Sequence, residues 1–118
     1  MLGKMQREKG KRGERELASR LREYGYNSRR GVQYCGRNGD ADVVGLPGLH
    51  IEVKRTERLN LYTALAQSKS DARDEEIPVV CHRKNHCEWV CILSLDEFMK
   101  IYKEWESGRY LDGRECEQ

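Results

Sequence analysis

Residues Ala41 to Arg55 read A-D-V-V-G-L-P-G-L-H-I-E-V-K-R, and this stretch decides the fold. Its second half alternates apolar and polar side chains, which is the period of a β-strand. In such a strand Ile51 and Val53 point to one face, and Glu52 and Lys54 point to the other. An acidic and a basic side chain are therefore expected side by side on the polar face of this strand.

The first half of the stretch predicts a second strand. Asp42-Val43-Val44 is short and apolar, and Gly45-Leu46-Pro47-Gly48 has the composition of a tight turn. A hairpin of this kind brings Asp42 back towards Glu52. Two carboxylates suit Mg²⁺ or Mn²⁺, which favour hard oxygen ligands and also bind substrate phosphate. Lys54 is placed to stabilise charge that builds up on phosphoryl oxygens.

These residues carry a resemblance to a known family. Asp42 followed by Glu52-Val53-Lys54 resembles the PD-(D/E)xK nuclease signature, with Ala41 in place of a proline that is not a ligand. Four pieces, in order and spacing, resemble the archaeal-type Holliday junction resolvases and their phage-encoded relatives. They are K-G-K-R-G-E-R-E (Lys9 to Glu16), A-D-V-V (Ala41 to Val44), H-I-E-V-K (His50 to Lys54) and P-V-V (Pro78 to Val80).

The resemblance implies a fold, an activity and a metal site. The expected fold is restriction-endonuclease-like, an α/β (α+β) arrangement in which a central mixed sheet is flanked by helices. The expected activity is Mg²⁺-dependent cleavage of branched DNA by a homodimer, with Mn²⁺ as a substitute and no small-molecule cofactor. In this interpretation Asp42 and Glu52 hold the metal, the Val53 carbonyl is a further ligand, and Lys54 positions the attacking water.

A third carboxylate is expected on the first helix. From about Lys11 to Tyr24 the apolar residues recur at helical spacing, and Glu14 shares the face of Leu17 and Leu21. A carboxylate on a core-facing stripe is costly unless a metal or a basic group meets it. The resemblance also assigns a catalytic glutamate to Glu14, which would complete the metal shell or orient water. The alternative is a surface glutamate in the first helical turn, since Met1 to Glu8 is expected to fray.

A second helix, from about Asn60 to Arg73, carries Gln67 beside its apolar stripe. The resemblance places a glutamine of this helix near the acid and the lysine, so Gln67 is a candidate catalytic residue. A structural or solvent-facing amide is the alternative. The stripe itself is expected to be buried and consists of Leu61, Ala64, Leu65, Ser68 and Ala72.

The charge distribution predicts where DNA would bind. Residues 1–37 contain 11 Lys and Arg against 4 Glu, a balance of +7, whereas the rest of the chain has 11 basic against 16 acidic residues, a balance of −5. The basic end is a candidate footprint for a polyanion, although a solvated basic helix would have the same composition. The candidate DNA-binding residues are Lys11, Arg12, Arg29, Arg30, Arg37, Arg55, Arg58 and Lys69.

Asp40, two residues before Asp42, could assist or replace Asp42 as a metal ligand.

A rival metal site lies in Cys81-His82-Arg83-Lys84-Asn85-His86-Cys87, which holds two cysteines and two histidines. Neighbouring residues of a strand face opposite sides, so Cys81 and His82 are expected to diverge, as are His86 and Cys87. Buried thiols and histidines at a hairpin tip are therefore preferred to structural zinc.

The remaining elements complete one domain. Short strands are expected at Tyr26 to Val32, Pro78 to His82 and Glu88 to Leu93. A helix begins at a capping box formed by Ser94 and Glu97 and stops at Gly108. It is expected to pack through Leu95, Phe98, Met99, Tyr102 and Trp105. Residues 1–108 would form a single nuclease domain and residues 109–118 a loose tail.

The five cysteines form no disulfide framework, and no stretch has the length of a membrane span or the form of a signal peptide. We therefore expect a cytoplasmic protein of a bacterial, archaeal or phage-infected cell. Two other functions fit the same residues. One is a stand-alone phage-type nuclease acting on other DNA structures, and the other is a non-catalytic DNA-binding module.

Overall fold

The computed structural model describes residues 2–32 and 41–111. Within them a five-stranded mixed sheet is combined with three helices, which confirms the expected α+β architecture. The elements are α1 (Leu2–Arg22), β1 (Arg29–Arg30), β2 (Val43–Val44), β3 (Leu49–Arg55), α2 (Leu61–Asp71), β4 (Ile77–Arg83), β5 (Val90–Ile92) and α3 (Leu95–Leu111).

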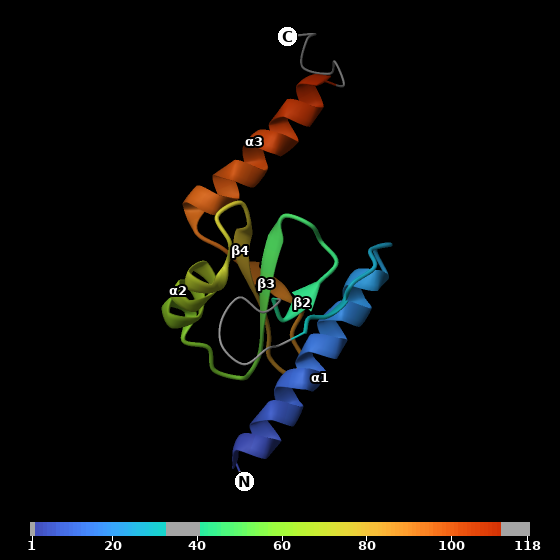
Figure 1. Cartoon of the computed structure of the whole chain (residues 1–118), viewed down its shortest axis with the longest axis vertical. Coiled ribbons are helices and arrows are strands. Elements are labelled where there is room, and N and C mark those ends of the chain that lie inside the picture. Colours follow the sequence, from blue (N-terminus) through green and yellow to red (C-terminus); the bar gives the residue numbers. More distant parts are fainter. Residues whose placement is uncertain (1, 33–40, 112–118) are drawn as a thin grey trace.

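The strands lie in the order β1-β2-β3-β4-β5. β3 is the centre of the sheet, pairing antiparallel with β2 and parallel with β4. The parallel pair is connected through α2, which contacts both strands, while β4 and β5 form an antiparallel hairpin. Figure 1 shows α1 on one side of this sheet and α2 on the other.

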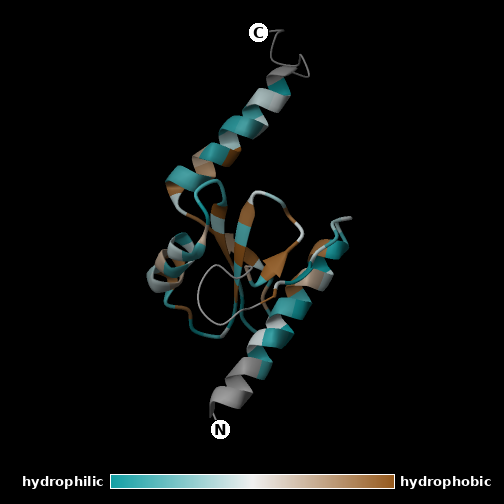
Figure 2. Ribbon diagram, in the orientation of Figure 1, coloured by the Kyte–Doolittle hydropathy of each residue, from teal (hydrophilic) through white to brown (hydrophobic). Residues whose placement is uncertain are grey.

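The core lies between α1 and one face of the sheet. Leu17 and Ala18 of α1 are buried there against Val43, Ile51 and Val53. The alternation of β3 thus directs its apolar side chains to α1, as expected. In Figure 2 the central strands are mostly brown, whereas the helices are mixed in hydropathy. The opposite face of β3 is left for polar side chains.

Several expected boundaries are wrong. α1 begins at Leu2, so residues 2–8 are helical rather than frayed, because helix-forming residues such as Gln6 and Glu8 continue the hydrogen-bonded turns. The helix ends at Arg22 and is followed by Gly25 in a left-handed conformation, with φ of 97°. The strand expected at Tyr26 to Val32 is only two residues long.

The second helix begins and ends close to the expected positions. The Asn60 side chain caps α2 by accepting a hydrogen bond from the backbone N–H of Thr63. Ala64 and Ser68 are buried, but Leu61, which was expected in the buried stripe, is exposed. Leu61 is the first residue of α2.

The third helix differs most from expectation. Its N-cap is as expected, because the Ser94 hydroxyl accepts from the backbone N–H of Glu97. The helix does not stop at Gly108 but continues to Leu111. The expected packing is wrong, since the side chains assigned to it are exposed. In Figure 1 α3 projects away from the sheet, so its length carries these side chains beyond the body of the fold.

Two glycines permit close approaches that shape the site. Gly45, in the β2–β3 turn, has φ of 116°, and a Cβ there would lie 2.5 Å from the Asn27 carbonyl oxygen. Gly13 lies where α1 crosses the end of β3, and a Cβ there would lie 2.6 Å from the Cβ of Arg55. Neither contact leaves room for a side chain.

Gly13 and Gly10 form a matched pair within α1. A Cβ at Gly10 would meet no atom within 4 Å. We expect Gly10→Ala to raise the free energy of unfolding by about 0.5–1 kcal/mol through helix propensity. Gly13→Ala gains the same propensity but must push α1 off β3, so we expect a net loss of about 1–2 kcal/mol. Urea denaturation of both variants tests this, and equal effects would contradict the close approach.

Candidate active site

The β2–β3 hairpin brings two carboxylates together. Val43 pairs with Ile51, and the Asp42 backbone N–H donates to the Ile51 carbonyl over 3.0 Å. The Asp42 side chain then reaches over β3, where its Oδ2 accepts a hydrogen bond of 2.8 Å from the backbone N–H of Val53. The Asp42 side chain is also hydrogen-bonded to the side chain of Glu52, which is half-buried.

The pKa values of the two carboxyl groups are shifted in opposite directions. Burial, together with the hydrogen bond and the negative charge of Glu52, raises the pKa of Asp42 to about 8. Burial opposes ionisation of Glu52 too, but hydrogen bonds from His50 and Asp42 lower its pKa. In the metal-free protein near neutral pH the pair therefore shares one proton.

His50 is a site residue that the sequence analysis did not select. Its side chain is 5% exposed, with Nε2 2.9 Å from Oε1 of Glu52 and Nδ1 3.4 Å from Oε1 of Glu76. The hydrogen bond to Glu52 raises the pKa of His50, although burial opposes the charge. His50 precedes Glu52 by two residues on the same face of β3, so the strand alternation itself could have identified it.

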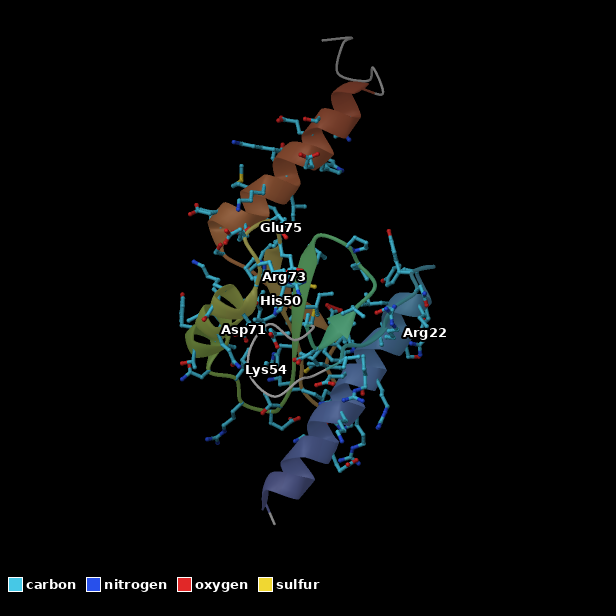
Figure 3. All side chains as sticks on the ribbon, in the orientation of Figure 1. Arg22, His50, Lys54, Asp71, Arg73 and Glu75 are labelled. Atoms are coloured by element: carbon cyan, nitrogen blue, oxygen red, sulfur yellow. The ribbon has the colours of Figure 1, made fainter. Side chains whose placement is uncertain are left out.

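Lys54 completes the polar face of β3. It is partly buried, and its positive charge contributes to the lowered pKa of Glu52, so the two side chains are neighbours as expected. Figure 3 shows Lys54 and His50 along β3, with Asp71 at the end of α2 and Arg73 just beyond it. Asp71, Arg73 and His50 line one cavity of about 170 Å³ next to the hairpin turn.

Glu14 meets a basic group. Its Oε1 lies 2.9 Å from Nε of Arg30, and the Glu14 side chain is only 15% exposed. The negative charge of Glu14 also contributes to the raised pKa of Asp42, which places it near the carboxylate pair. Because α1 begins at Leu2, Glu14 is not in a first helical turn, and that alternative is wrong. Whether Glu14 contacts a metal stays a prediction.

Two other candidates are less closely tied to the pair. Gln67 is exposed on α2, and its assignment as a catalytic residue stays a prediction. Val53 contributes its N–H to Asp42, while a ligand role for its carbonyl is likewise untested. Asp40 and Arg37 lie outside the described residues.

The candidate DNA-binding residues differ in how far they are available. Arg12, Arg29, Arg58 and Lys69 are exposed, and Lys11 is partly exposed. Arg30 is paired with Glu14, and Arg55 lies 3.3 Å from Glu16 and 3.8 Å from Glu57.

Glu16 is paired with Arg55 at the end of β3. It also lies 2.7 Å from Arg83, so it connects α1 to the ends of both β3 and β4.

The cysteine and histidine cluster of the β4–β5 hairpin is dispersed. Cys81 is buried with its Sγ 3.9 Å from that of Cys91, and His82 Nε2 lies 2.9 Å from the Thr56 carbonyl. His86 and Cys87 are exposed at the turn.

In residues 2–32 and 41–111 no three His, Cys, Asp or Glu side chains are grouped to share a metal. The Asp42–Glu52 pair has hard oxygen atoms and only two carboxylates, which is what Mg²⁺ takes when waters and substrate fill its other positions.

The comparison with protein families shows which family the chain belongs to. The model of the archaeal Holliday junction resolvase (Hjc) family matches residues 5–90. The chain belongs to this family. The comparisons with curated proteins and with solved structures each found no match.

Membership of the Hjc family covers all elements that build the site. The match extends from α1 to the first residue of β5, and includes Glu14, Asp42, Glu52 and Lys54. The five-stranded mixed sheet is consistent with the restriction-endonuclease-like fold, and the family with the PD-(D/E)xK nucleases. α3 lies beyond the matched residues. None of the described helices is long and apolar enough to cross a membrane.

The raised pKa of Asp42 makes the metal-free protein less stable as the pH rises. In the unfolded chain this carboxyl loses its proton near 3.8, whereas in the folded chain it keeps the proton up to about 8. Its contribution to stability is therefore complete below pH 3.8 and falls through this window. We expect Asp42→Asn, in EDTA at pH 8, to raise the free energy of unfolding by on the order of 2 kcal/mol.

Thermal denaturation of both proteins at pH 4 and pH 8 measures this effect. At pH 4 the two proteins are expected to differ little, because the carboxyl is protonated in the folded state and only begins to lose its proton in the unfolded chain. Asp74→Asn is the control, since Asp74 is an exposed aspartate outside the carboxylate pair. A stability difference that is the same at both pH values would contradict the shared proton.

Proposed function

We propose that the protein is a Mg²⁺-dependent endodeoxyribonuclease that resolves Holliday junctions. The observation that carries this proposal is the Asp42–Glu52 pair, which the β2–β3 hairpin holds together next to Lys54. The family match supports a nuclease of Holliday junction resolvase type. Metal dependence and the roles of individual residues are the parts that the proposal adds.

Asp42 and Glu52 would hold Mg²⁺, with the Val53 carbonyl as a further ligand. Metal binding requires the proton on Asp42 to leave, and the neighbouring Glu52 is already ionised. A bound Mg²⁺ supplies a Lewis acid and makes a water more acidic at neutral pH. His50 donates to Glu52 and fixes the direction of that carboxylate.

Lys54 and Glu14 would act on the reacting groups from two sides. Lys54 projects from the same face of β3 as Glu52, where its charge would stabilise the phosphoryl oxygens during hydrolytic, in-line cleavage. Glu14, held by Arg30, would orient the attacking water or complete the metal shell. Gln67 would approach the phosphodiester from α2.

The DNA would lie along the basic surface of α1 and the strand that follows it. Arg12 and Arg29 are exposed there, and Arg58 and Lys69 are exposed as well. Contacts of this kind go to phosphates and add affinity without sequence preference. A four-way junction requires two symmetric nicks, so the active form would be a homodimer.

The proposal is tested by cleavage of a labelled four-way junction beside a linear duplex and a flap of the same sequence. Wild type is expected to make paired symmetric nicks in the junction with Mg²⁺ or Mn²⁺, and none in EDTA. Glu52→Gln and Lys54→Ala should each lower the cleavage rate at least about 100-fold while DNA binding persists. Their matched controls are Glu75→Gln and Lys84→Ala, which change exposed residues outside the carboxylate pair.

The possible results separate the alternatives. Cleavage of all three DNAs would retain the active site and remove the junction preference, as in a nuclease for other DNA structures. Binding by wild type without metal-dependent cleavage would leave a DNA-binding module and contradict the proposal.

The contact between His50 and Glu52 gives a second prediction. We expect His50→Ala to lower cleavage about 10–100-fold at limiting Mg²⁺, with a smaller loss at saturating Mg²⁺, because Glu52 loses the donor that orients it. His50→Gln, whose amide can still donate, should recover part of the loss. His86→Ala changes an exposed histidine and serves as control. Equal Mg²⁺ requirements of His50→Ala and wild type would rule out this role.

A further inference from the structure

Helix α3 exposes an apolar face that no other described element covers extensively. Trp105 is 54% exposed and Leu95 is 73% exposed, although both are large apolar side chains. Four more residues of this helix are exposed by at least 38%, namely Phe98, Met99, Ile101 and Tyr102. Contiguous apolar surface of this kind on a soluble protein marks an interaction site.

The spacing of these residues is that of a helix that pairs with another helix. Leu95, Phe98, Tyr102 and Trp105 occupy alternating steps of three and four residues, which are the a and d positions of two heptads. Met99 and Ile101 lie on the two flanks of this stripe. Phe98 and Tyr102 are successive on the stripe, and the rings of Tyr102 and Trp105 lie 5.5 Å apart. The stripe therefore continues over most of the helix.

The amount of exposed surface is sufficient for a second copy of the same helix. Side chains of this size have on the order of 200 Å² of surface each. At the observed exposures, the six residues offer roughly 600 Å² per copy, or roughly 1,200 Å² for two. This reaches the lower range of stable protein interfaces. A pair of α3 helices would thus bury enough surface to hold two chains together.

The charges favour an antiparallel pair. Asp96 and Lys103 lie seven residues apart on the same flank of the stripe. When two copies pair antiparallel about Lys100, Phe98 packs on Tyr102 of the second copy. Asp96 then faces the side of the second helix that carries Lys103. The helix dipoles also oppose one another in this arrangement.

We propose that α3 is the self-association helix of this protein, pairing antiparallel with α3 of a second copy. The helix lies beyond residues 5–90, so this surface adds to the part of the chain shared with the resolvase family. The use of the dimer, which presents two active sites to one junction, rests on the proposed function. The dimer itself requires neither metal nor DNA.

Sedimentation of the full chain without metal or DNA tests the proposal. Wild type is expected at twice the chain mass of 13.8 kDa, and Glu52→Gln should behave in the same way. The double variant Phe98→Arg, Trp105→Arg should weaken the dimer by about 100-fold or more. Glu104→Arg combined with Ser107→Arg places the same charges on the opposite face of α3 and should leave the dimer intact.

Circular dichroism confirms that both double variants keep their helices. A monomeric wild type, or a dimer that persists in Phe98→Arg, Trp105→Arg, would overturn the proposal. Because the readout is mass alone, a nuclease that fails on junction DNA leaves this result unaffected.

The pairing direction is tested by cross-linking. Met99 lies next to the expected two-fold axis, so Met99→Cys should form a disulfide-linked dimer in a chain with Cys35, Cys87, Cys91 and Cys116 replaced by serine. A dimer that does not cross-link would overturn the antiparallel pairing. The dimer would then be formed either by parallel α3 helices or by α3 in the groove of about 680 Å³ between α1 and the β4–β5 hairpin, lined by Leu21 and Trp89.

Discussion

The site depends on the apposition of Asp42 and Glu52 across a hairpin whose turn is only four residues long. Asp42 and Glu52 cannot both be ionised side by side in a half-buried position without a large cost, and the pKa of Asp42 near 8 expresses that conflict. A divalent cation would resolve it, because it replaces the shared proton with a charge that both carboxylates can bind. The instability of the metal-free pair and its proposed catalytic use therefore have one physical cause.

The rest of the fold holds this unfavourable pair in place. Gly45 allows the hairpin turn to contact the chain before β1, and Gly13 allows α1 to lie directly on β3. His50 contacts the Glu52 carboxylate through its Nε2 atom, and Glu16 connects α1 to the ends of the central strands. The stability of the core between α1 and the sheet offsets the free-energy cost of the carboxylate pair.

The sequence predicted the parts of the structure that depend on local spacing. Strand alternation and the turn residues identified the hairpin and the pairing of Asp42 with Glu52, and helical spacing placed Glu14 on the inner face of α1. Prediction from the sequence failed where the exposure or position of a side chain depends on which residues it contacts. The apolar stripe of α3 has the same spacing whether it packs on its own sheet or on another chain, so its exposure could not be foreseen. The contact of His50 with Glu76 also required the fold.

The central claim is that Asp42 and Glu52 together form one metal-binding site. Its most direct test is calorimetric titration of the full chain with Mn²⁺ at pH 7.5. We expect binding by wild type and by Glu75→Gln, and loss of binding in both Asp42→Asn and Glu52→Gln. Binding should also weaken as the pH falls, because protons compete for the same carboxylates. Unchanged Mn²⁺ binding in either variant of the pair would contradict the account, since the cation would then be held elsewhere.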